Sequence, residues 1–301
     1  MTDGPILILG GAGFVGAATY RALAARGLEP LTADVAGDAD HHLDVCDLDA
    51  VEALLVQLRP AVVMNFAFRL ADASTEALDA SFRVNALGAQ NALEASRRAG
   101  VSRFLFASSI AVYGDQADWG DHELAEADHG RPVRAYGWQK QLQEAMATEY
   151  RERFGMTCAG VRVSTVYGRG RSAGLSAPIS TLVAPPEDGR VRVPWSPDEG
   201  FDLIHVDDVA EVFERLAQAP ELPHAIYNSG GDRRTVGELV DEVRRLRPDL
   251  AVDFAEPPAT LAHCHRIDWS RLRALIGDDR PGIAQRLIAE ARPSRAQGGP
   301  E

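Results

Sequence analysis

A glycine-rich turn near the N-terminus is the feature that most restricts the fold. A short apolar run, residues 6–9, leads into residues 10–16, which read GGAGFVG, and a segment with helical apolar spacing follows. Gly11, Gly13 and Gly16 satisfy G-x-G-x-x-G, and Gly10 begins an overlapping G-x-x-G-x-x-G. Glycines permit a tight turn and close approach of a pyrophosphate, while the helix N-terminus offers free N–H groups. Strand, turn and helix in this order predict a dinucleotide-binding unit.

An acidic residue ends the second predicted strand and indicates which dinucleotide is bound. Residues 30–33 lead into Asp34, and no lysine or arginine lies between Arg26 and Arg59. A carboxylate at this place accepts hydrogen bonds from the adenosine ribose hydroxyls and repels a 2′-phosphate. The sequence therefore favours NAD over NADP.

Strands and helices alternate along most of the chain. The predicted strands are residues 6–9, 30–33, 61–67, 104–107, 158–163 and 201–206, and the predicted helices include 47–58, 77–99 and 136–154. This alternation predicts a parallel, doubly wound α/β sheet of the Rossmann type. Ligands of such sheets bind at the carboxyl ends of the strands, where Gly10, Asp34, Phe66 and Ser108 lie.

The remainder of the chain is predicted to form a smaller C-terminal α/β substrate lobe. The predicted division gives residues 1–168 and 201–229 to the nucleotide-binding domain, and residues 169–200 and 230–301 to the lobe. Residues 115–135 are predicted to form a polar surface loop. Residues 172–200 carry five prolines and are predicted to be a long irregular insertion. Residues 292–301 are predicted to be disordered.

Composition narrows the possible partners and the compartment. The net charge of −13 argues against nucleic acid and anionic membranes. The chain has no apolar run of membrane-spanning length and no signal peptide ahead of residues 6–9. Cys46, Cys158 and Cys264 lack metal-ligand spacing, so they are interpreted as reduced thiols and no metal site is predicted. These features predict a cytoplasmic protein.

Tyr136 and Lys140 form the candidate catalytic pair. Four residues apart on a helix, they lie on one face. A free tyrosine titrates near pH 10, and a lysine charge at about 4 Å is worth ~4 kcal/mol at an effective dielectric of 20. We therefore expect Lys140 to lower the pKa of Tyr136 toward 7, where a general base works best.

The lysine content of the chain strengthens this interpretation. Of the 31 lysine and arginine residues, Lys140 is the only lysine. Arginine is a planar fork, whereas lysine is a compact point charge on a flexible stem. A site that holds one ammonium between a phenol and a sugar hydroxyl requires the latter.

Taken together, the motifs resemble the extended short-chain dehydrogenase/reductase family, in its NAD-dependent epimerase/dehydratase branch. They cover about residues 5–230 and occur in the family's order. They are the glycine turn at 10–16, Asp34, Asp44-Val45, Asn65-Phe66-Ala67, Asn85, Ser108-Ser109, Val112-Tyr113-Gly114, Tyr136 with Lys140, residues 162–168, and His205-Val206-Asp207-Asp208-Val209.

The resemblance implies roles for individual residues. Tyr136 exchanges a proton with the substrate oxygen, Ser109 donates a hydrogen bond to it, and Lys140 also holds the nicotinamide ribose. The implied NAD-binding residues are Gly10, Gly13, Phe14, Val15, Gly16, Asp34, Asp44, Val45, Phe66, Ala67, Asn85, Tyr136, Lys140 and Val163. The candidate substrate residues are Phe68, Ser109, Ile110, Thr165, Arg171 and Phe201. The resemblance also implies a homodimer, in which helices 77–99 and 136–154 pair into a four-helix bundle.

Three departures from the family pattern bear on the reaction. Ile110 and Ala111 follow Ser109 where sugar dehydratases place an Asp-Glu pair, so dehydration is not expected. Thr165 stands where many nucleotide-sugar enzymes have asparagine. Phe201 replaces the arginine that grips a substrate diphosphate in those enzymes.

Three functions remain open at this point. The first is a dehydrogenase or reductase acting on a small hydroxy compound: a sugar acid, a polyol or a hydroxy acid. The second is a nucleotide-sugar 4-epimerase that uses the same residues, with Arg171, Arg190 or Arg192 on the phosphate. The third is a cofactor-sensing regulator, although such proteins typically lose the Tyr/Lys pair that this chain keeps.

Overall fold

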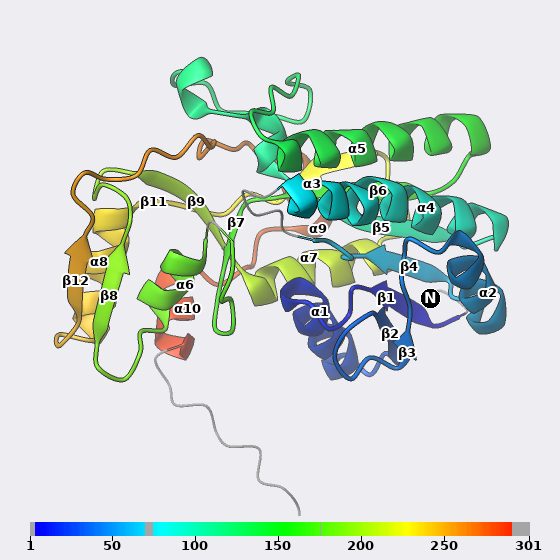
Figure 1. Ribbon diagram of the computed structural model, residues 1–301, viewed down its shortest axis with the longest axis horizontal. Helices are drawn as coiled ribbons and strands as arrows, with labels where there is room; N and C mark the ends of the chain where they lie inside the picture. Colours follow the sequence, from blue (N-terminus) through cyan, green and yellow to red (C-terminus); the bar gives the residue numbers. More distant parts are fainter. Residues whose placement is uncertain (1–3, 70–74, 175, 291–301) are drawn as a thin grey trace, which may run out of the picture.

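A seven-stranded parallel sheet forms the larger part of the molecule (Figure 1). The computed structural model describes residues 4–69, 75–174 and 176–290. The sheet contains β1 (Ile6–Leu9), β2 (Pro30–Asp34), β3 (His41–His42), β4 (Val62–Asn65), β5 (Arg103–Ser109), β6 (Cys158–Val163) and β10 (Ile226–Asn228) in the order β10-β6-β5-β4-β1-β2-β3. Every neighbouring pair is parallel. The predicted doubly wound Rossmann-type sheet is confirmed.

Helices cover both faces of this sheet. On one face lie α1 (Phe14–Ala25), α7 (Val206–Gln218) and α9 (Ser270–Ile276), and on the other lie α2 (Leu48–Leu58), α4 (Ala89–Arg98) and α5 (Ala135–Phe154). Because side chains alternate along a strand, Ile8 packs into the first layer and Leu7 into the second. Both side chains are fully buried. Each face of the central strands therefore has its own apolar core.

The predicted helix 77–99 is three consecutive segments. They are α3 (Thr75–Phe82), a π-helical turn η1 (Arg83–Gly88) and α4. The carbonyl oxygen of Asn85 accepts a hydrogen bond from the Gln143 side chain at 2.5 Å. A side chain that takes a helical carbonyl displaces the regular pattern, which accounts for the wider turn here.

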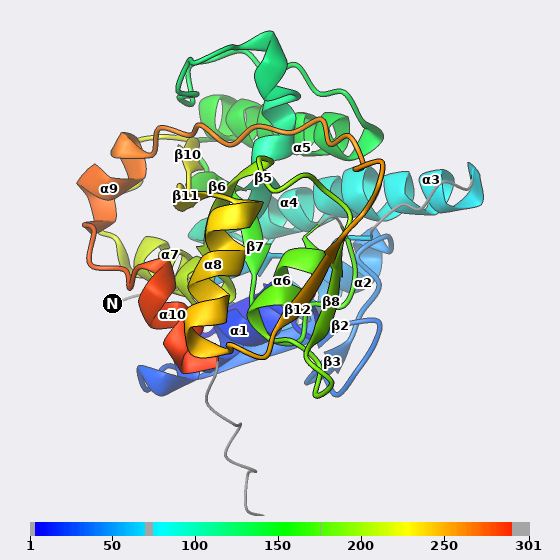
Figure 2. The same ribbon diagram turned by 90° about the vertical axis from the view of Figure 1, so that its left-hand side faces the viewer.

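In the described residues, the C-terminal lobe has two small sheets and three helices (Figure 2). One sheet has the order β11-β9-β7, from β7 (Thr165–Tyr167), β9 (Gly200–His205) and β11 (Asp232–Thr235), and the other pairs β8 (Arg190–Val193) with β12 (Ala251–Phe254). The helices are α6 (Ala177–Val183), α8 (Val236–Leu246) and α10 (Ile283–Glu290). β9, predicted as residues 201–206 of the nucleotide-binding domain, thus pairs inside the lobe. The domain division remains a prediction.

Residues 172–200 are more regular than the prolines suggest. They contain α6 and β8, so the prediction of an irregular insertion is wrong. Ile179, Leu182 and Val191 are buried in the core of the lobe, and Pro178 falls in the first turn of α6, where proline is tolerated. The region 110–135 is mostly loop, with short 3-10 turns η2 (Ile110–Tyr113) and η3 (Gln116–Asp118). Residues 292–301 lie outside the described residues.

Candidate active site

The first turn of α5 places Tyr136 beside the end of β5. A Cβ atom on Gly137 would lie 2.5 Å from the carbonyl oxygen of Ala111. Only glycine therefore lets α5 approach η2 this closely, and the contact brings Tyr136 next to Ser109. Gly137 was not predicted as a site residue, although its place between Tyr136 and Lys140 was a usable signal.

Lys140 is buried, and its ammonium is held by β5. Its Nζ donates hydrogen bonds to the carbonyl oxygen of Ala107 at 2.7 Å and to Oε1 of Gln143 at 3.3 Å. It also lies 4.7 Å from the centroid of the Phe68 ring. Burial lowers the pKa of Lys140 to about 7, and the Glu144 carboxylate opposes this shift.

Tyr136 contacts the same Phe68 ring. The Phe68 and Tyr136 rings meet edge to face, with centroids 4.9 Å apart. Burial raises the pKa of Tyr136, and the Ser109 hydroxyl and the Arg171 charge oppose that rise. The expected lowering of the Tyr136 pKa by Lys140 is therefore not found. The ammonium is bonded to Ala107 and lies 5.9 Å from the phenol ring centroid, and desolvation outweighs the favourable charges.

Ser109 joins the pair at the last position of β5. Its Oγ accepts a hydrogen bond from the backbone N–H of Ala111 at 3.2 Å and so caps η2. The Ser109 hydroxyl also bonds the Tyr136 phenol, and this contact lowers the pKa of Tyr136. The structure thus brings together Ser109, Tyr136 and Lys140, as the sequence predicts.

Arg171 reaches this site from the loop that follows β7. Its guanidinium carbon lies 5.6 Å from the Phe14 ring centroid at the start of α1, and its charge acts on Tyr136. Its Nε is buried, and no described residue accepts a hydrogen bond from it. Burial lowers the pKa of Arg171. A desolvated guanidinium with an unused donor is suited to binding an anion.

The glycine turn has the shape that a dinucleotide requires. A Cβ on Gly10, whose φ is +77°, would lie 2.5 Å from the Ala67 nitrogen, and one on Gly16 would lie 2.2 Å from the Gly10 oxygen. Gly13 caps α1 without a side-chain hydrogen bond, so N–H groups of the first turn of α1 remain for a phosphate. These residues fit the pyrophosphate of NAD.

Asp34 is oriented by the same turn. Its Oδ2 accepts a hydrogen bond from the Ala12 N–H at 3.0 Å, and its Oδ1 accepts one from the Ala36 N–H at 3.2 Å. Each oxygen keeps a second lone pair for a ribose hydroxyl. The carboxylate is thus held at the end of β2, where the prediction requires it.

The other predicted NAD-binding residues lie along the same strand ends. Val45 is buried against Gly88, Val163 ends β6, and Phe66 packs edge to face on Phe213. The Asp44 carboxylate accepts the Cys46 N–H at 2.9 Å, and the Asn65 amide oxygen accepts the Ala67 N–H at 3.1 Å. Val15 is half-buried in α1.

Asn85 has a structural role that was not predicted from the sequence. Its side chain accepts a hydrogen bond from the Arg69 N–H at 2.8 Å and donates to the Arg69 carbonyl and to Oε1 of Gln139. It therefore fixes the segment that carries Phe68 over Tyr136.

Not every predicted substrate residue lies at the site. Phe201 is 2% exposed and packs between Trp195 and His263 in the lobe. It cannot narrow a substrate pocket, so this prediction is wrong: β9 points this side chain into the lobe core. Ile110 is also buried, and Thr165 is half-buried on β7. Arg190 and Arg192 are exposed on β8, near the end of the molecule opposite α2 (Figure 1).

A buried ion pair beneath the site was not predicted. Arg162 Nη2 lies 2.7 Å from Glu144 Oε2, and Ser108 Oγ donates to Glu144 Oε1 at 2.5 Å. Arg162 Nη1 also donates to the Tyr113 hydroxyl at 2.8 Å. The pair and the Ser108 bond link α5 to β5 and β6, one helical turn after Lys140. Its signal was the position of Glu144, one helical turn after Lys140.

This combination of parallel sheet, glycine turn and Ser/Tyr/Lys group defines an NAD-dependent enzyme of the extended short-chain dehydrogenase/reductase type. The chain belongs to the NAD dependent epimerase/dehydratase family, whose model matches residues 6–230. The resemblance seen in the sequence is confirmed, and with it NAD as the cofactor.

Relatives include both epimerases and dehydrogenases. The chain is 27% identical over 285 residues to a UDP-glucose 4-epimerase of Corynebacterium glutamicum, covering 85% of this chain and 86% of the relative. A Thermus thermophilus UDP-glucose 4-epimerase solved with NAD superposes with a TM-score of 0.82 at 25% identity, covering 95% of this chain and 97% of that one. A uronate dehydrogenase of Pseudomonas syringae is 28% identical over 153 residues, covering 50% of this chain and 46% of the relative.

The described part of the chain lacks two further features. None of the described helices combines the length and the apolar character needed to cross a bilayer. Within the same residues, no three His, Cys, Asp or Glu side chains are grouped to bind a metal ion.

Proposed function

We propose that the enzyme is an NAD-dependent dehydrogenase that oxidises a small hydroxy compound bearing a carboxylate, such as a sugar acid or a hydroxy acid. The observation that carries this proposal is Arg171. Its buried Nε is free of described acceptors, and its charge acts on Tyr136. A substrate carboxylate bound to Arg171 would use this free donor and would leave the rest of a small substrate to reach the Tyr136 phenol.

The proposed chemistry divides one oxidation between the side chains. Tyr136 takes the proton of the substrate hydroxyl, and the Ser109 hydroxyl donates a hydrogen bond to the same oxygen. Because burial raises the pKa of Tyr136, the phenol must first release its own proton to solvent before it can act as this base, and the charge of Arg171 favours the phenolate. NAD, when bound, accepts the hydride that leaves the substrate carbon. Residues 10–16 and Asp34 would hold it.

The arrangement of residues in the lobe favours a substrate without a diphosphate. Phe201 occupies the position of the diphosphate-binding arginine and is buried in the lobe core. Arg190 and Arg192, the other arginines considered for a phosphate, are exposed on β8. Of these three arginines, Arg171 is the one whose charge acts on Tyr136, which supports it as the anion-binding group.

A nucleotide-sugar 4-epimerase is the second candidate, because a UDP-glucose 4-epimerase matches this chain over most of both lengths. Calorimetry on the NAD-loaded enzyme separates the two functions. We expect UDP and UDP-glucose to bind with Kd above about 1 mM and D-glucuronate or D-galacturonate to bind more tightly, with the uronate affinity lost in Arg171→Met. Binding of UDP near 10 μM, roughly 7 kcal/mol, would reverse the order of the two candidates.

We also propose a cytoplasmic homodimer. Among the described residues, six large apolar side chains are exposed on α3, η1 and α5: Leu78, Phe82, Leu87, Trp138, Leu142 and Phe154. A surface of this kind favours an isologous contact in which two helices from each protomer form a four-helix bundle. The three cysteines are free thiols, as suits a reducing compartment.

A further inference from the structure

The loop that carries Arg171 has an unusual backbone. Gly168 has a φ of +143° and Gly170 has a φ of +95°, conformations that favour glycine. Within the loop, the Arg171 N–H donates to the Gly168 oxygen at a long 3.4 Å. The Gly168 N–H donates to Ser180 Oγ at 3.3 Å. Both bonds are long, and they do not by themselves fix the position of Arg171.

Glu290, at the end of α10, supplies the stronger contacts. Its Oε1 accepts a hydrogen bond from the Arg169 N–H at 3.0 Å, and its Oε2 lies 3.3 Å from Arg169 Nε. Its backbone oxygen accepts a hydrogen bond from Arg169 Nη2 at 2.5 Å. One residue thus holds both the backbone and the side chain of Arg169, two positions before Arg171.

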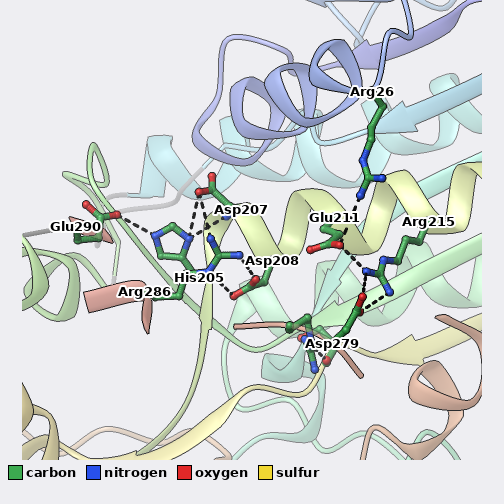
Figure 3. Close-up of polar contacts among 11 residues, drawn as sticks. Arg26, His205, Asp207, Asp208, Glu211, Arg215, Asp279, Arg286 and Glu290 are labelled. Atoms are coloured by element: carbon green, nitrogen blue, oxygen red, sulfur yellow. Dashed lines mark hydrogen bonds and ion pairs between the residues drawn. The ribbon is translucent and has the colours of Figure 1, made fainter. Parts of the chain in front are cut away.

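His205 holds the Glu290 carboxylate from the other side (Figure 3). Its Nδ1 accepts the Asp207 N–H at 3.2 Å, so in the neutral ring the proton is on Nε2. Nε2 therefore donates to Glu290 Oε1, at 2.9 Å. The His205 contact and the Arg169 N–H both lower the pKa of Glu290, so it is a carboxylate at neutral pH.

The helix α10, which carries Glu290, is anchored to the rest of the protein. Arg286 binds Asp208 of α7 through two nitrogens, one of them 3.2 Å from Oδ2 (Figure 3). Ile283 and Leu287 are buried in the lobe core. The helix therefore cannot shift easily relative to β9 and α7.

We infer that Glu290 is a positioning residue: it fixes the 168–171 loop, and with it the place of Arg171 beside Phe14, and it thereby sets how tightly the enzyme holds the anionic group of its substrate. The part that concerns substrate affinity rests on the proposed function. The part that concerns the loop does not.

The loop can be tested without any substrate, because Arg169 and Arg171 are themselves trypsin sites. Glu290→Gln keeps the size of the side chain and removes its charge, and Glu187→Gln, an exposed glutamate of the same lobe, is the control. We expect trypsin to cut Glu290→Gln after Arg169 or Arg171 at least about tenfold faster than the wild type, the control and Glu290→Asp. An unchanged cleavage rate in a variant that melts like the wild type would overturn the inference.

The kinetic arm uses D-glucuronate and D-galacturonate with NAD. For Glu290→Gln we expect KM for the uronate to rise about tenfold, kcat to stay within about threefold, and NAD affinity to be unchanged. A fall in kcat with KM unchanged would contradict the positioning role. If the wild type oxidises neither uronate, the same kinetics are measured with a hydroxy acid that it does oxidise. If it oxidises no acid, the proposed substrate class fails, and trypsin alone decides the role of Glu290. If Glu290→Gln does not fold, Arg169→Gln removes the guanidinium contacts with Glu290 from the loop side and leaves the Arg169 N–H bond, and cleavage at Arg171 is measured.

Discussion

Lys140 Nζ donates a 2.7 Å hydrogen bond to the carbonyl oxygen of Ala107, two residues before Ser109. The bond joins the helix that carries Tyr136 to the strand that carries Ser109. Phe68 covers the ammonium at 4.7 Å, so the space around it is limited. The one lysine of the chain therefore helps to hold Tyr136 and Ser109 in place as well as carrying charge.

Replacing Lys140 by arginine should impair the enzyme although the charge remains. A planar guanidinium does not fit the buried space between Ala107 and Phe68. We expect kcat to fall by at least about 100-fold in Lys140→Arg, the lower end of what general acid–base groups contribute. Tyr136→Phe should lose turnover and keep NAD affinity, as measured by fluorescence titration. Wild-type rates in Lys140→Arg would exclude this role for the ammonium.

The low pKa of Lys140 predicts a pH-dependent stability difference. Its pKa is about 7 in the folded protein and near 10.4 when unfolded, so between these values the unfolded chain binds more protons. The Lys140 contribution thus makes the wild type more stable as pH rises above 7. Urea unfolding at pH 7, 8 and 9 should show the wild type gaining on Lys140→Met by up to about 1.4 kcal/mol per pH unit. A constant difference between the two proteins would mean that Lys140 stays fully charged.

Asp34 should determine the choice between NAD and NADP. We expect at least a ~10-fold preference for NAD, since an unpaired carboxylate facing a phosphate costs more than about 1.4 kcal/mol. Asp34→Asn should reduce this preference, whereas Asp38→Asn, on the exposed loop that follows β2, should not. Fluorescence titration of both cofactors measures the effect. Equal affinities in the wild type would refute the role of Asp34.

The exposed apolar face of α5 should mediate dimerisation. Light scattering at micromolar concentration should give about twice 32.5 kDa for the wild type. Leu142→Glu places a charge in the proposed bundle and should yield monomers. Leu246→Glu, which alters an exposed leucine on α8 in the lobe, is the control. A monomeric wild type would remove the bundle.

The sequence predicted the sheet and the proximity of Ser109, Tyr136 and Lys140 because these depend on local patterns. Strand–helix alternation, the glycine turn and the Tyr136–Lys140 spacing are each contained in short windows. The lobe was harder, since proline content masked α6 and β8, whose apolar residues matter only once they pack together.

The remaining errors concern which way side chains face and what surrounds them. A motif aligns Phe201 with a substrate residue, but only the packing of β9 shows that it faces the core. Likewise, the sequence spacing of Tyr136 and Lys140 predicts that the lysine charge lowers the pKa of Tyr136. The desolvation that instead raises this pKa depends on the assembled fold and cannot be seen in the spacing. The Glu290–Arg169 contact joins residues far apart in sequence and leaves no local signal.

Net NADH formation is the most direct test of the proposed dehydrogenase activity. The purified enzyme is mixed with excess NAD and a panel of uronates, hydroxy acids, neutral polyols and UDP-sugars, and NADH absorbance is followed. We predict sustained NADH formation, well beyond one equivalent per enzyme, with at least one of the acids and not with the UDP-sugars. Conversion of UDP-glucose to its 4-epimer without net NADH would contradict the dehydrogenase assignment.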